Sequence, residues 1–364
     1  MADGPASQCG SARPLGVEGP GADGTSDGIF LNRSWSIAGV RISNRVVLGP
    51  MAGVTNSAFR TLCRRYGAGL VVSEMVSAYG LRYRNRRTRD YLRFREEERP
   101  IAVQLFGDEP RVLAEGAAVV LENEPRPDLL DLNLGCPVRK VVRSGAGCAL
   151  AERPELAAAC LEALVSVAGP RGVPVTAKIR SGPRPGEVTA IELAQRLEAA
   201  GAAAVAVHPR AASQMYRCRA DHAVTAAVGE AITVPVIASG DVDSVAAGRA
   251  VISRTGAAAI MVARGVLGNP KLIAGLLSGE EPERPSVAEA VDALLELADL
   301  AEEDMGSERA GRWLRKHVGW FLSRAGVEGR IRDALQREPD LEPLRCELRS
   351  LAEGRFGSSE PPAV

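Results

Sequence analysis

The sequence has little that points to a membrane or to a metal. It contains no run of 18 apolar residues, so we expect no transmembrane helix and no membrane partner. Its first 30 or so residues lack a basic segment followed by an apolar one, so we expect no signal peptide and a cytoplasmic protein. The seven cysteines include no Cys-x-x-Cys pair, so we expect no metal site.

An excess of charge of one sign is also missing. The 45 basic residues equal the 45 acidic ones, so no overall field attracts nucleic acid, and any such binding must come from local patches. Lysine is scarce, and arginine supplies the other basic residues; the lysines are Lys140, Lys178, Lys271 and Lys316. Codon bias in a GC-rich genome explains such an excess of arginine, so each lysine is more informative than the arginine count.

Composition and periodicity divide the chain into four parts. Residues 1–34, mostly small and polar, are expected to form a disordered tail. Residues 35–280 hold all the strand candidates. After a charged, proline-containing linker at 279–285, residues 286–355 have helical periodicity without strand candidates, which predicts a separate helical domain. Residues 356–364 are expected to form a second disordered tail.

Eight short runs between residues 46 and 262 predict strands. Most are continuously apolar, as in a parallel sheet that is buried on both faces. They are Val46–Leu48, Leu70–Ser73, Ile101–Leu105, Leu129–Asn133, Val175–Ile179, Ala204–Val207, Val236–Ala238 and Ala259–Val262. Amphipathic segments separate them at Ser57–Tyr66, Pro110–Glu122, Pro154–Ala168, Val188–Ala200, Ala220–Val228 and Ser244–Arg254. This alternation predicts an α/β fold, a (β/α)8 TIM barrel, with an open doubly wound sheet as the alternative.

Several strand ends carry polar or small residues, which is where the active sites of TIM barrels lie. The loop Gly49–Gly53 either lets a flat ligand approach the backbone or is a plain tight turn. Gln104 and Lys178 lie in apolar strands and need partners; for Lys178 these are an anionic flavin, a phosphate or a buried carboxylate. His208 ends the sixth strand, where a single histidine is also compatible with a core position.

The last two strand ends contain glycines that expose backbone N–H groups. They read Ala238-Ser239-Gly240-Asp241 and Val262-Ala263-Arg264-Gly265, and loops at these positions commonly bind phosphate in TIM barrels. Ordinary strand-to-helix turns are the alternative. Together with the glutamine, lysine and histidine above, these loops suit flavin mononucleotide (FMN), with its ring over the barrel mouth.

The segment Asp131–Cys148 carries the strongest chemical signal. A strand ends in Gly135-Cys136-Pro137, and Arg139, Lys140 and Arg143 follow within one short stretch. A thiol with an ordinary pKa of about 8.5 is mostly protonated near neutrality and can act as a general acid. Opposite a flavin, it would complete a reduction in which hydride and proton reach opposite faces. A buried structural cysteine is the alternative.

Two further segments mix arginine with aromatic residues. Residues 79–95 contain seven arginines and four aromatics after the second strand, which predicts either an RNA surface or a solvated helix face. Residues 312–321 repeat the mixture, with Trp313 and Trp320 on one helix face; these tryptophans could also simply pack the helical region onto the barrel.

The ordered set of motifs resembles the tRNA-dihydrouridine synthase family, nearest to its bacterial B-type branch. The motifs run from residue 46 to about 322 in the family's order. They are Pro50-Met-Ala-Gly-Val-Thr-Asn56, Val103-Gln-Leu-Phe-Gly107, Asn133-Leu-Gly-Cys-Pro137, Lys178-Ile-Arg180, His208, Gly240-Asp-Val242, Arg264-Gly265 and Arg315-Lys-His-Val-Gly-Trp320.

The resemblance implies an FMN-binding barrel and a helical tRNA-binding domain that together reduce a uridine in tRNA to 5,6-dihydrouridine, with NADPH as electron donor. It implies that Cys136 gives a proton to C5, that the flavin gives hydride to C6, and that Asn133 holds the uracil edge. The implied FMN-binding residues are Pro50, Met51, Ala52, Gln104, Lys178, His208, Ser239, Gly240, Asp241, Ala263 and Arg264. The implied tRNA contacts are Arg139, Lys140, Arg143, Arg180, Arg315 and Lys316.

The sequence departs from the family's pattern in the loops after His208 and Ala238. The family usually has His-Gly-Arg-Thr where this chain has His208-Pro-Arg-Ala211, and Ala-Asp-Trp where it has Ala220-Asp-His222. Two other functions stay open: an FMN-dependent TIM-barrel oxidoreductase acting on a free pyrimidine or an enoate, and a catalytically inactive tRNA-binding barrel. The arginine-rich segment argues against the first, and Cys136 with Lys178 against the second. The oligomeric state is not predicted.

Overall fold

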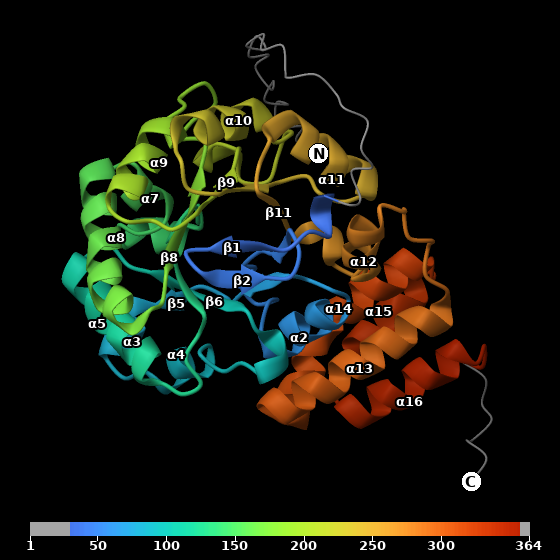
Figure 1. The fold of residues 1–364 in the computed structure, drawn as a ribbon. Helices are drawn as coiled ribbons and strands as arrows, with labels where there is room; N and C mark the ends of the chain where they lie inside the picture. The colour runs from blue at the N-terminus through green and yellow to red at the C-terminus, as the bar shows by residue number, and fades with distance from the viewer. Residues whose placement is uncertain (1–29, 357–364) are drawn as a thin grey trace, which may run out of the picture.

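The computed structural model describes residues 30–356 and contains a closed barrel of eight parallel strands (Figure 1). The strands are β3 (Val46–Leu48), β4 (Leu70–Val72), β6 (Ile101–Phe106), β7 (Leu129–Leu134), β8 (Val175–Arg180), β9 (Val205–His208), β10 (Val236–Ser239) and β11 (Ala259–Val262). The ring closes because β11 pairs with β3 and β4 pairs with β6. The predicted TIM barrel is therefore confirmed, and the open sheet is excluded. Every predicted strand is present, with ends that differ by one residue at most.

Helices follow most of the strands and surround the barrel (Figure 1). The longer ones are α2 (Ser57–Arg65), α5 (Pro110–Glu122), α8 (Pro154–Ala168), α9 (Ala190–Ala199), α10 (His222–Ala231), α11 (Val245–Thr255) and α12 (Lys271–Ser278). Local sequence sets several of their starts: Asn56 and Ser244 accept hydrogen bonds from first-turn N–H groups, and α5 and α8 begin with proline. Shorter helices are α3 (Ala78–Arg82), α4 (Arg86–Asp90), α6 (Arg139–Arg143) and α7 (Cys148–Ala151).

A small antiparallel hairpin closes the amino-terminal end of the barrel. It consists of β1 (Trp35–Ile37) and β2 (Val40–Ile42), and it is not among the predicted strands. Ile37 and Ile42 are fully buried against barrel residues such as Val47 and Met261. A polar residue, Ser36 or Arg41, interrupts each of these strands, so neither forms the continuous apolar run that predicted the barrel strands. Because the hairpin fills this end, a ligand can enter only at the carboxyl ends of the strands.

Four helices follow the linker at 279–285: α13 (Val287–Met305), α14 (Ser307–Ala325), α15 (Gly329–Arg337) and α16 (Leu341–Ala352). They lie on one side of the barrel, next to α2 and α12 (Figure 1). A capping box between Ser286 and Glu289 starts α13. Leucines of α13, α14 and α16 are buried in one cluster with Phe59 and Leu62 of α2. The helices thus share a core with the barrel, which positions α14 at the barrel mouth.

The predicted disordered tails fall mostly on residues 1–29 and 357–364, which lie outside the described residues. Within the described part, Phe30 and Leu31 pack against the rest of the protein, whereas residues 32–34 are exposed. Leu31 is buried, and the Arg45 guanidinium lies over the Phe30 ring, 4.3 Å from its centroid. Two adjacent apolar side chains provide this burial. Phe356 likewise packs against the core that contains the C-terminal helices. Between residues 30 and 356, no helix has the length and apolar composition required to cross a membrane.

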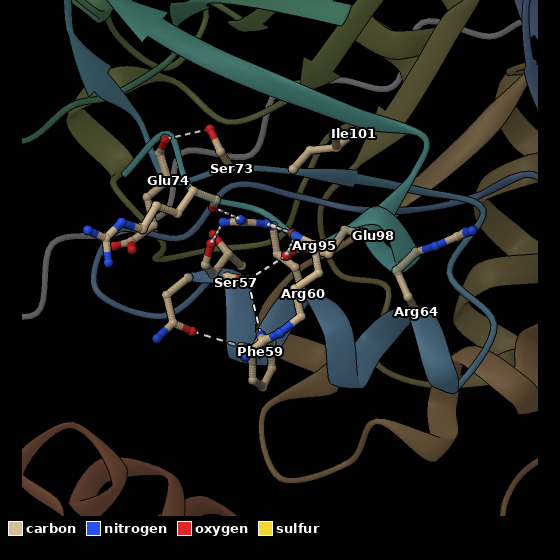
Figure 2. A network of polar contacts seen from close by, with 12 residues as sticks. Ser57, Phe59, Arg60, Arg64, Ser73, Glu74, Arg95, Glu98 and Ile101 are labelled. Atoms are coloured by element: carbon tan, nitrogen blue, oxygen red, sulfur yellow. Dashed lines mark hydrogen bonds and ion pairs between the residues drawn. The ribbon is translucent and has the colours of Figure 1, made fainter. Parts of the chain in front are cut away.

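A buried ion pair joins the first barrel helix to the segment that follows the arginine-rich stretch (Figure 2). Arg60 Nε lies 2.6 Å from Glu98 Oε2, and both side chains are almost completely buried. Arg60 also donates hydrogen bonds to the carbonyl groups of Thr55 and Arg93, at 2.6 and 2.9 Å. The second oxygen of Glu98 accepts from Ser57 Oγ and from the Arg95 N–H. The network therefore anchors the loop after β3 and the end of the arginine-rich segment together.

Candidate active site

A cavity of about 730 Å³ opens at the carboxyl ends of the barrel strands, within the usual size range of small-molecule sites. Residues on or after seven of the eight strands line it, together with Met75 from the interrupted strand β4/β5, where β5 is Val76–Ser77. It brings together every residue expected to bind FMN, namely Pro50, Met51, Ala52, Gln104, Lys178, His208, Ser239, Gly240, Asp241, Ala263 and Arg264, and also Cys136, Asn133 and Arg180.

A chain of hydrogen bonds leads from the barrel core to the loop of Cys136. The two carboxylate oxygens of buried Asp131 accept from Thr176 Oγ1 at 2.6 Å and from Gln104 Nε2 at 2.7 Å. Gln104 Oε1 accepts from Asn133 Nδ2 at 2.7 Å, and Asn133 Oδ1 accepts from the Cys136 N–H at 3.0 Å. Burial raises the pKa of Asp131, and the bonds from Gln104 and Thr176 oppose this shift. The carboxylate thus determines which way both amides point.

The turn Gly145-Ala146-Gly147-Cys148 holds the Cys136 loop on its other side. The Cys136 carbonyl accepts from the Cys148 N–H at 3.1 Å. Gly147 has a φ of +61°, and a Cβ there would lie 2.6 Å from the Cys136 carbonyl oxygen, so only glycine fits. Burial raises the pKa of the Cys136 thiol, and the charges of Arg180 and Lys178 oppose the shift only in part. The thiol is therefore protonated at neutral pH, as a general acid must be.

The Lys178 amine reaches the cavity without a partner among the described residues. No hydrogen bond or ion pair from those residues holds it. Burial lowers the pKa of Lys178 to about 8; Arg180 adds to the shift, and Asp131 opposes it. A partly buried amine without a counter-charge is costly, so an anionic ligand in the cavity would supply the missing interaction.

His208 is buried at the rim and paired with an arginine. Its Nε2 lies 3.1 Å from Arg210 Nη1, so Nε2 accepts a hydrogen bond and the ring is neutral. Burial lowers the pKa of His208 far below its usual range, and nearby cations add to the effect. Arg210 also pairs with Asp241 at 2.5 Å. Burial alone would raise the pKa of Asp241, but the N–H of Ala220 and the Arg210 guanidinium outweigh it and lower the pKa. This cluster fixes the loops after β9 and β10 against each other.

Two loops present backbone N–H groups to the cavity. Those of Gly240, Asp241 and Gly265 donate to no other group between residues 30 and 356. Asp241 itself has a φ of +54°, in the left-handed region. Arg264 is half exposed and lies over the Tyr216 ring, 5.0 Å from its centroid. Free N–H groups beside a half-exposed guanidinium are the donor set that binds a phosphate.

The loop at residues 50–53 is held between the barrel and α14. The Gly53 N–H donates to the buried carboxylate of Glu74. The Gly53 carbonyl accepts from Trp313 Nε1 at 3.2 Å and from Lys316 Nζ. Helix α14 therefore fixes one wall of the cavity directly.

Three predicted substrate contacts are occupied by the protein itself. Arg180 is buried and donates to the carbonyl groups of Gly135, Ala211 and Met215, at 2.9, 3.2 and 2.8 Å. Lys316 donates to Gly53, outside the cavity lining. The Asn133 amide donates to Gln104 Oε1 through Nδ2 and accepts from the Cys136 N–H through Oδ1. These bonds connect segments that are remote in sequence, which the sequence motifs could not reveal.

The other predicted tRNA contacts are more open. Arg139, Lys140 and Arg143 are exposed on α6, beside the cavity, and Arg315 is half-buried on α14; no ion pair with a described residue engages their side chains. In the arginine-rich segment, Arg84, Arg86, Arg87 and Arg89 are exposed and similarly unpaired within residues 30–356. Tyr83 next to them is 73% exposed.

Sequence reasoning missed several residues of the site. Asp131 and Thr176 lie in apolar strands, so the argument applied to Gln104 would also have found them. Arg210 follows His208 by two residues on the same rim, but its burial could not be read from the sequence. Trp320 and Arg324 of α14 line the cavity, and only the packing of the C-terminal helices places them there.

The fold resembles those of two enzymes of known structure. A morphinone reductase structure superimposes with a TM-score of 0.51 at 15% identity, covering 72% of this chain and 93% of that one. An amine oxidase, HisD from Pseudomonas geniculata N1, gives 0.57 at 14% identity, covering 92% and 67%. At these identities the likeness shows the fold alone.

Sequence relatives are much closer. The tRNA-dihydrouridine synthase B of Pseudomonas aeruginosa is 39% identical over 288 residues, which are 78% of this chain and 85% of the relative. The protein of the same name from Shewanella oneidensis is 36% identical over 286 residues, 78% and 87% of the two chains. A family model described as dihydrouridine synthase (Dus) matches residues 47–349. The chain therefore belongs to the dihydrouridine synthase family.

Proposed function

We propose that this protein reduces one or more uridines in tRNA to 5,6-dihydrouridine, with bound FMN as the redox cofactor and NADPH as the electron donor. Membership of the family supports the reaction. The observation that carries the assignment is the protonated Cys136 thiol, which shares one cavity with the unpartnered Lys178 amine. A tRNA substrate agrees with the cytoplasmic location expected from the sequence.

The residues around the cavity fit FMN. Lys178 offers a cation to the flavin ring, while the free N–H groups of Gly240, Asp241 and Gly265, with Arg264, offer a phosphate site. Pro50, Met51 and Ala52 form an apolar wall on which a flat ring can lie. When bound, FMN supplies the hydride that reaches C6 of the uracil. The Cys136 Sγ–H gives its proton to C5, which requires the thiol form that burial favours.

Asn133 acts in this proposal as a positioning residue for Cys136. Its Oδ1 accepts from the N–H groups of Gly135 and Cys136, at 3.3 and 3.0 Å, and so fixes the turn that carries the thiol. Arg180 fixes the same turn through the Gly135 carbonyl. These assignments replace the expected contacts of both side chains with the RNA.

The tRNA would lie across the barrel mouth and the C-terminal helices. Arg139, Lys140, Arg143 and Arg315, together with Arg84, Arg86, Arg87 and Arg89, provide cations for its phosphates, and exposed Tyr83 offers a ring for a base. We place the catalytic part at residues 35–280 and the tRNA-binding helices at 286–355. A barrel for a free pyrimidine or an enoate would need neither surface, because these substrates carry no phosphate chain.

Nucleoside mapping of tRNA from a strain without this gene tests the function. We expect at least one dihydrouridine to revert to uridine and to return when the gene is restored. The purified protein should be yellow and should lose its colour on addition of NADPH. Unchanged dihydrouridine at every position, in a strain without a second synthase, would reject the proposal, and colourless protein would favour an inactive RNA-binding barrel.

Replacement of Lys178 by methionine should weaken FMN binding by about 10- to 100-fold, because a charge-assisted contact in a partly buried site is lost. Since the pKa of Lys178 is about 8, the affinity of wild-type apoprotein should be constant below pH 8 and fall about tenfold per pH unit above it. The variant should lack this pH dependence. Fluorescence titrations with FMN from pH 6 to 10 measure both effects.

The control for this experiment is Lys271→Met, which removes an exposed lysine that pairs with Glu289 on the surface. Its FMN affinity and pH dependence should match those of the wild type. In the apoprotein, the lowered pKa also means that the folded state holds fewer protons than the unfolded chain between pH 8 and 10.5, so stability should rise across that window. An affinity that is equal in wild type and Lys178→Met at pH 7 would contradict the assignment.

Replacement of Asp131 by leucine should lower kcat at least tenfold while the KM for tRNA changes little, because the chain of bonds to the Cys136 loop loses its fixed end. Asp131→Asn should recover most of the activity, since its amide oxygen can still accept from Gln104 and its NH2 can donate to Thr176. Steady-state kinetics with tRNA measure kcat and the KM for tRNA separately. Equal losses in both variants would indicate a role of the charge itself.

A further inference from the structure

A second cavity of about 580 Å³ adjoins the catalytic one. It lies between the linker at 279–285, the segment before α12 and the last turns of α14. Leu267, Trp320 and Arg324 line both cavities, so the two share a wall. No residue expected from the sequence to bind FMN lines the second cavity.

Asn269 is an unpartnered polar side chain that points into this second cavity. Its residue is 6% exposed, yet its amide makes no hydrogen bond with any described residue. Its side-chain atoms are not among the fully enclosed polar atoms without partners, so the amide keeps some exposed area, and the residue lines the cavity. A nearly buried amide that lines a cavity and has no partner among the described residues is placed to bind a ligand with both donors and acceptors.

Trp320 and Arg324 present a flat ring and a cation beside this amide. They are four residues apart on α14 and therefore lie on one face of the helix. One side of the Trp320 ring packs against His317, with ring centroids 5.1 Å apart. The Arg324 guanidinium is exposed and has no ion-pair partner among residues 30–356. A close backbone contact fixes the arrangement, because a Cβ on Gly268 would lie 2.4 Å from the Trp320 carbonyl oxygen.

We propose that the second cavity binds a nucleotide of the tRNA adjacent to the uridine that enters the catalytic cavity. Asn269 would bind the edge of the neighbouring base, Trp320 would contact its face, and Arg324 would bind the phosphate that joins the two nucleotides. This subsite rests on the proposed function, since it presupposes that a tRNA uridine enters the catalytic cavity.

The geometry favours RNA over the adenylate half of NADPH. A uridine that leaves its stack remains joined to its neighbours, so a flanking nucleotide must lie within one phosphate linkage of the catalytic cavity, and the shared wall is such a position. The linker lines the second cavity with Arg284 and with two carboxylates, those of Glu281 and Glu283, which outnumber it. Their charges would oppose the additional 2′-phosphate of NADPH, whereas a single linking phosphate can stay beside Arg324.

The test compares Asn269→Ala and Arg324→Gln with wild type in the two half-reactions of the FMN-loaded protein. We expect oxidation of the reduced flavin by a tRNA transcript to need about tenfold more tRNA in each variant, the effect of one lost polar contact to a charged or paired group. Reduction of the flavin by NADPH without RNA should be unchanged in Asn269→Ala, because Asn269 lines the second cavity and not the catalytic one. Arg330→Gln is the matched control, because Arg330 is exposed on α15 and its one ion pair among the described residues is with Glu328; it should match wild type.

A second measurement tests adjacency. Two transcripts are compared, each with an abasic site on one side of the mapped uridine. One of them should bind wild type about tenfold more weakly than the intact transcript does. Asn269→Ala should bind that same transcript with little further loss of affinity. A shift in NADPH dependence instead of tRNA dependence would assign the cavity to the donor and overturn the proposal. Wild-type values in both half-reactions would overturn it as well. Failure of wild type itself to oxidise its flavin with tRNA would reject the proposed function and is distinguishable from either result.

Discussion

Replacement of Cys136 by alanine should slow the oxidation of reduced flavin by tRNA by about 10²- to 10⁴-fold, the usual contribution of a general acid. Two features of the structure suit the thiol to this proposed role. Burial keeps it protonated, and the bonds of Asn133 and Cys148 to the Cys136 backbone hold the turn that carries it. Because these bonds involve the backbone, alanine should leave the turn unchanged. Flavin content, reduction by NADPH and tRNA binding should therefore stay at wild-type levels.

Stopped-flow measurement of the two half-reactions separates these effects. The matched control is Cys148→Ala, which removes a neighbouring buried thiol that does not line the cavity; burial raises the pKa of Cys148 to about 11. It should keep nearly full activity. A Cys136→Ala protein with a normal rate of flavin oxidation would show that the proton comes from another group. Loss of flavin from the variant would instead indicate a binding role.

The strands and their polar ends could be predicted from the sequence because both depend on short-range patterns. Continuous apolar runs predict buried parallel strands, and the barrel geometry places the residue after each strand at one end. Gln104, Lys178 and His208 come together in the cavity for that reason. The short hairpin β1–β2 lacked such a pattern, although Ile37 and Ile42 complete the barrel core.

The sequence could not predict which basic side chains are bonded to the protein itself and which stay exposed, because the bonds go to carbonyl groups that are remote in sequence. Arg180 is fixed by the backbone at 135, 211 and 215, and Lys316 by the backbone at 53. Arg139 has the same charge but remains exposed. Motifs identify which residues occur together, whereas only packing decides which guanidinium groups stay free for phosphate. The proposed tRNA surface is therefore best defined by the exposed arginines that have no ion pair with a described residue.

The buried pair of Arg60 and Glu98 gives the largest expected effect on stability. Arg60→Leu should lower the free energy of unfolding by about 3–5 kcal/mol, because Glu98 would keep a buried charge without its partner. The carbonyl groups of Thr55 and Arg93 would also lose their donor. Against a total stability of about 5–15 kcal/mol, such a loss should be evident in chemical denaturation followed by circular dichroism.

A matched control lies on the same helix. Arg65 pairs with Glu97 and Glu296 at the surface, where its side chain is 43% exposed, so Arg65→Leu should cost about 1 kcal/mol or less. The double variant Arg60→Leu/Glu98→Leu removes both charges and should be more stable than Arg60→Leu alone, which separates the penalty of an unpaired charge from the loss of the pair. Similar losses in Arg60→Leu and Arg65→Leu would show that burial adds nothing to the pair.

The same substitution should also affect RNA binding, because the network holds the end of the arginine-rich segment (Figure 2). Arg60 holds the Arg93 carbonyl, Glu98 holds the Arg95 N–H, and Arg95 pairs with Asp304 of α13 at 2.7 Å. When these contacts loosen, the exposed arginines before residue 93 should bind phosphate in a less fixed arrangement. We therefore expect weaker tRNA binding by Arg60→Leu under conditions in which it is still folded, with the rate of flavin reduction by NADPH unchanged. Equal tRNA affinity in the folded variant would limit the network to a role in stability.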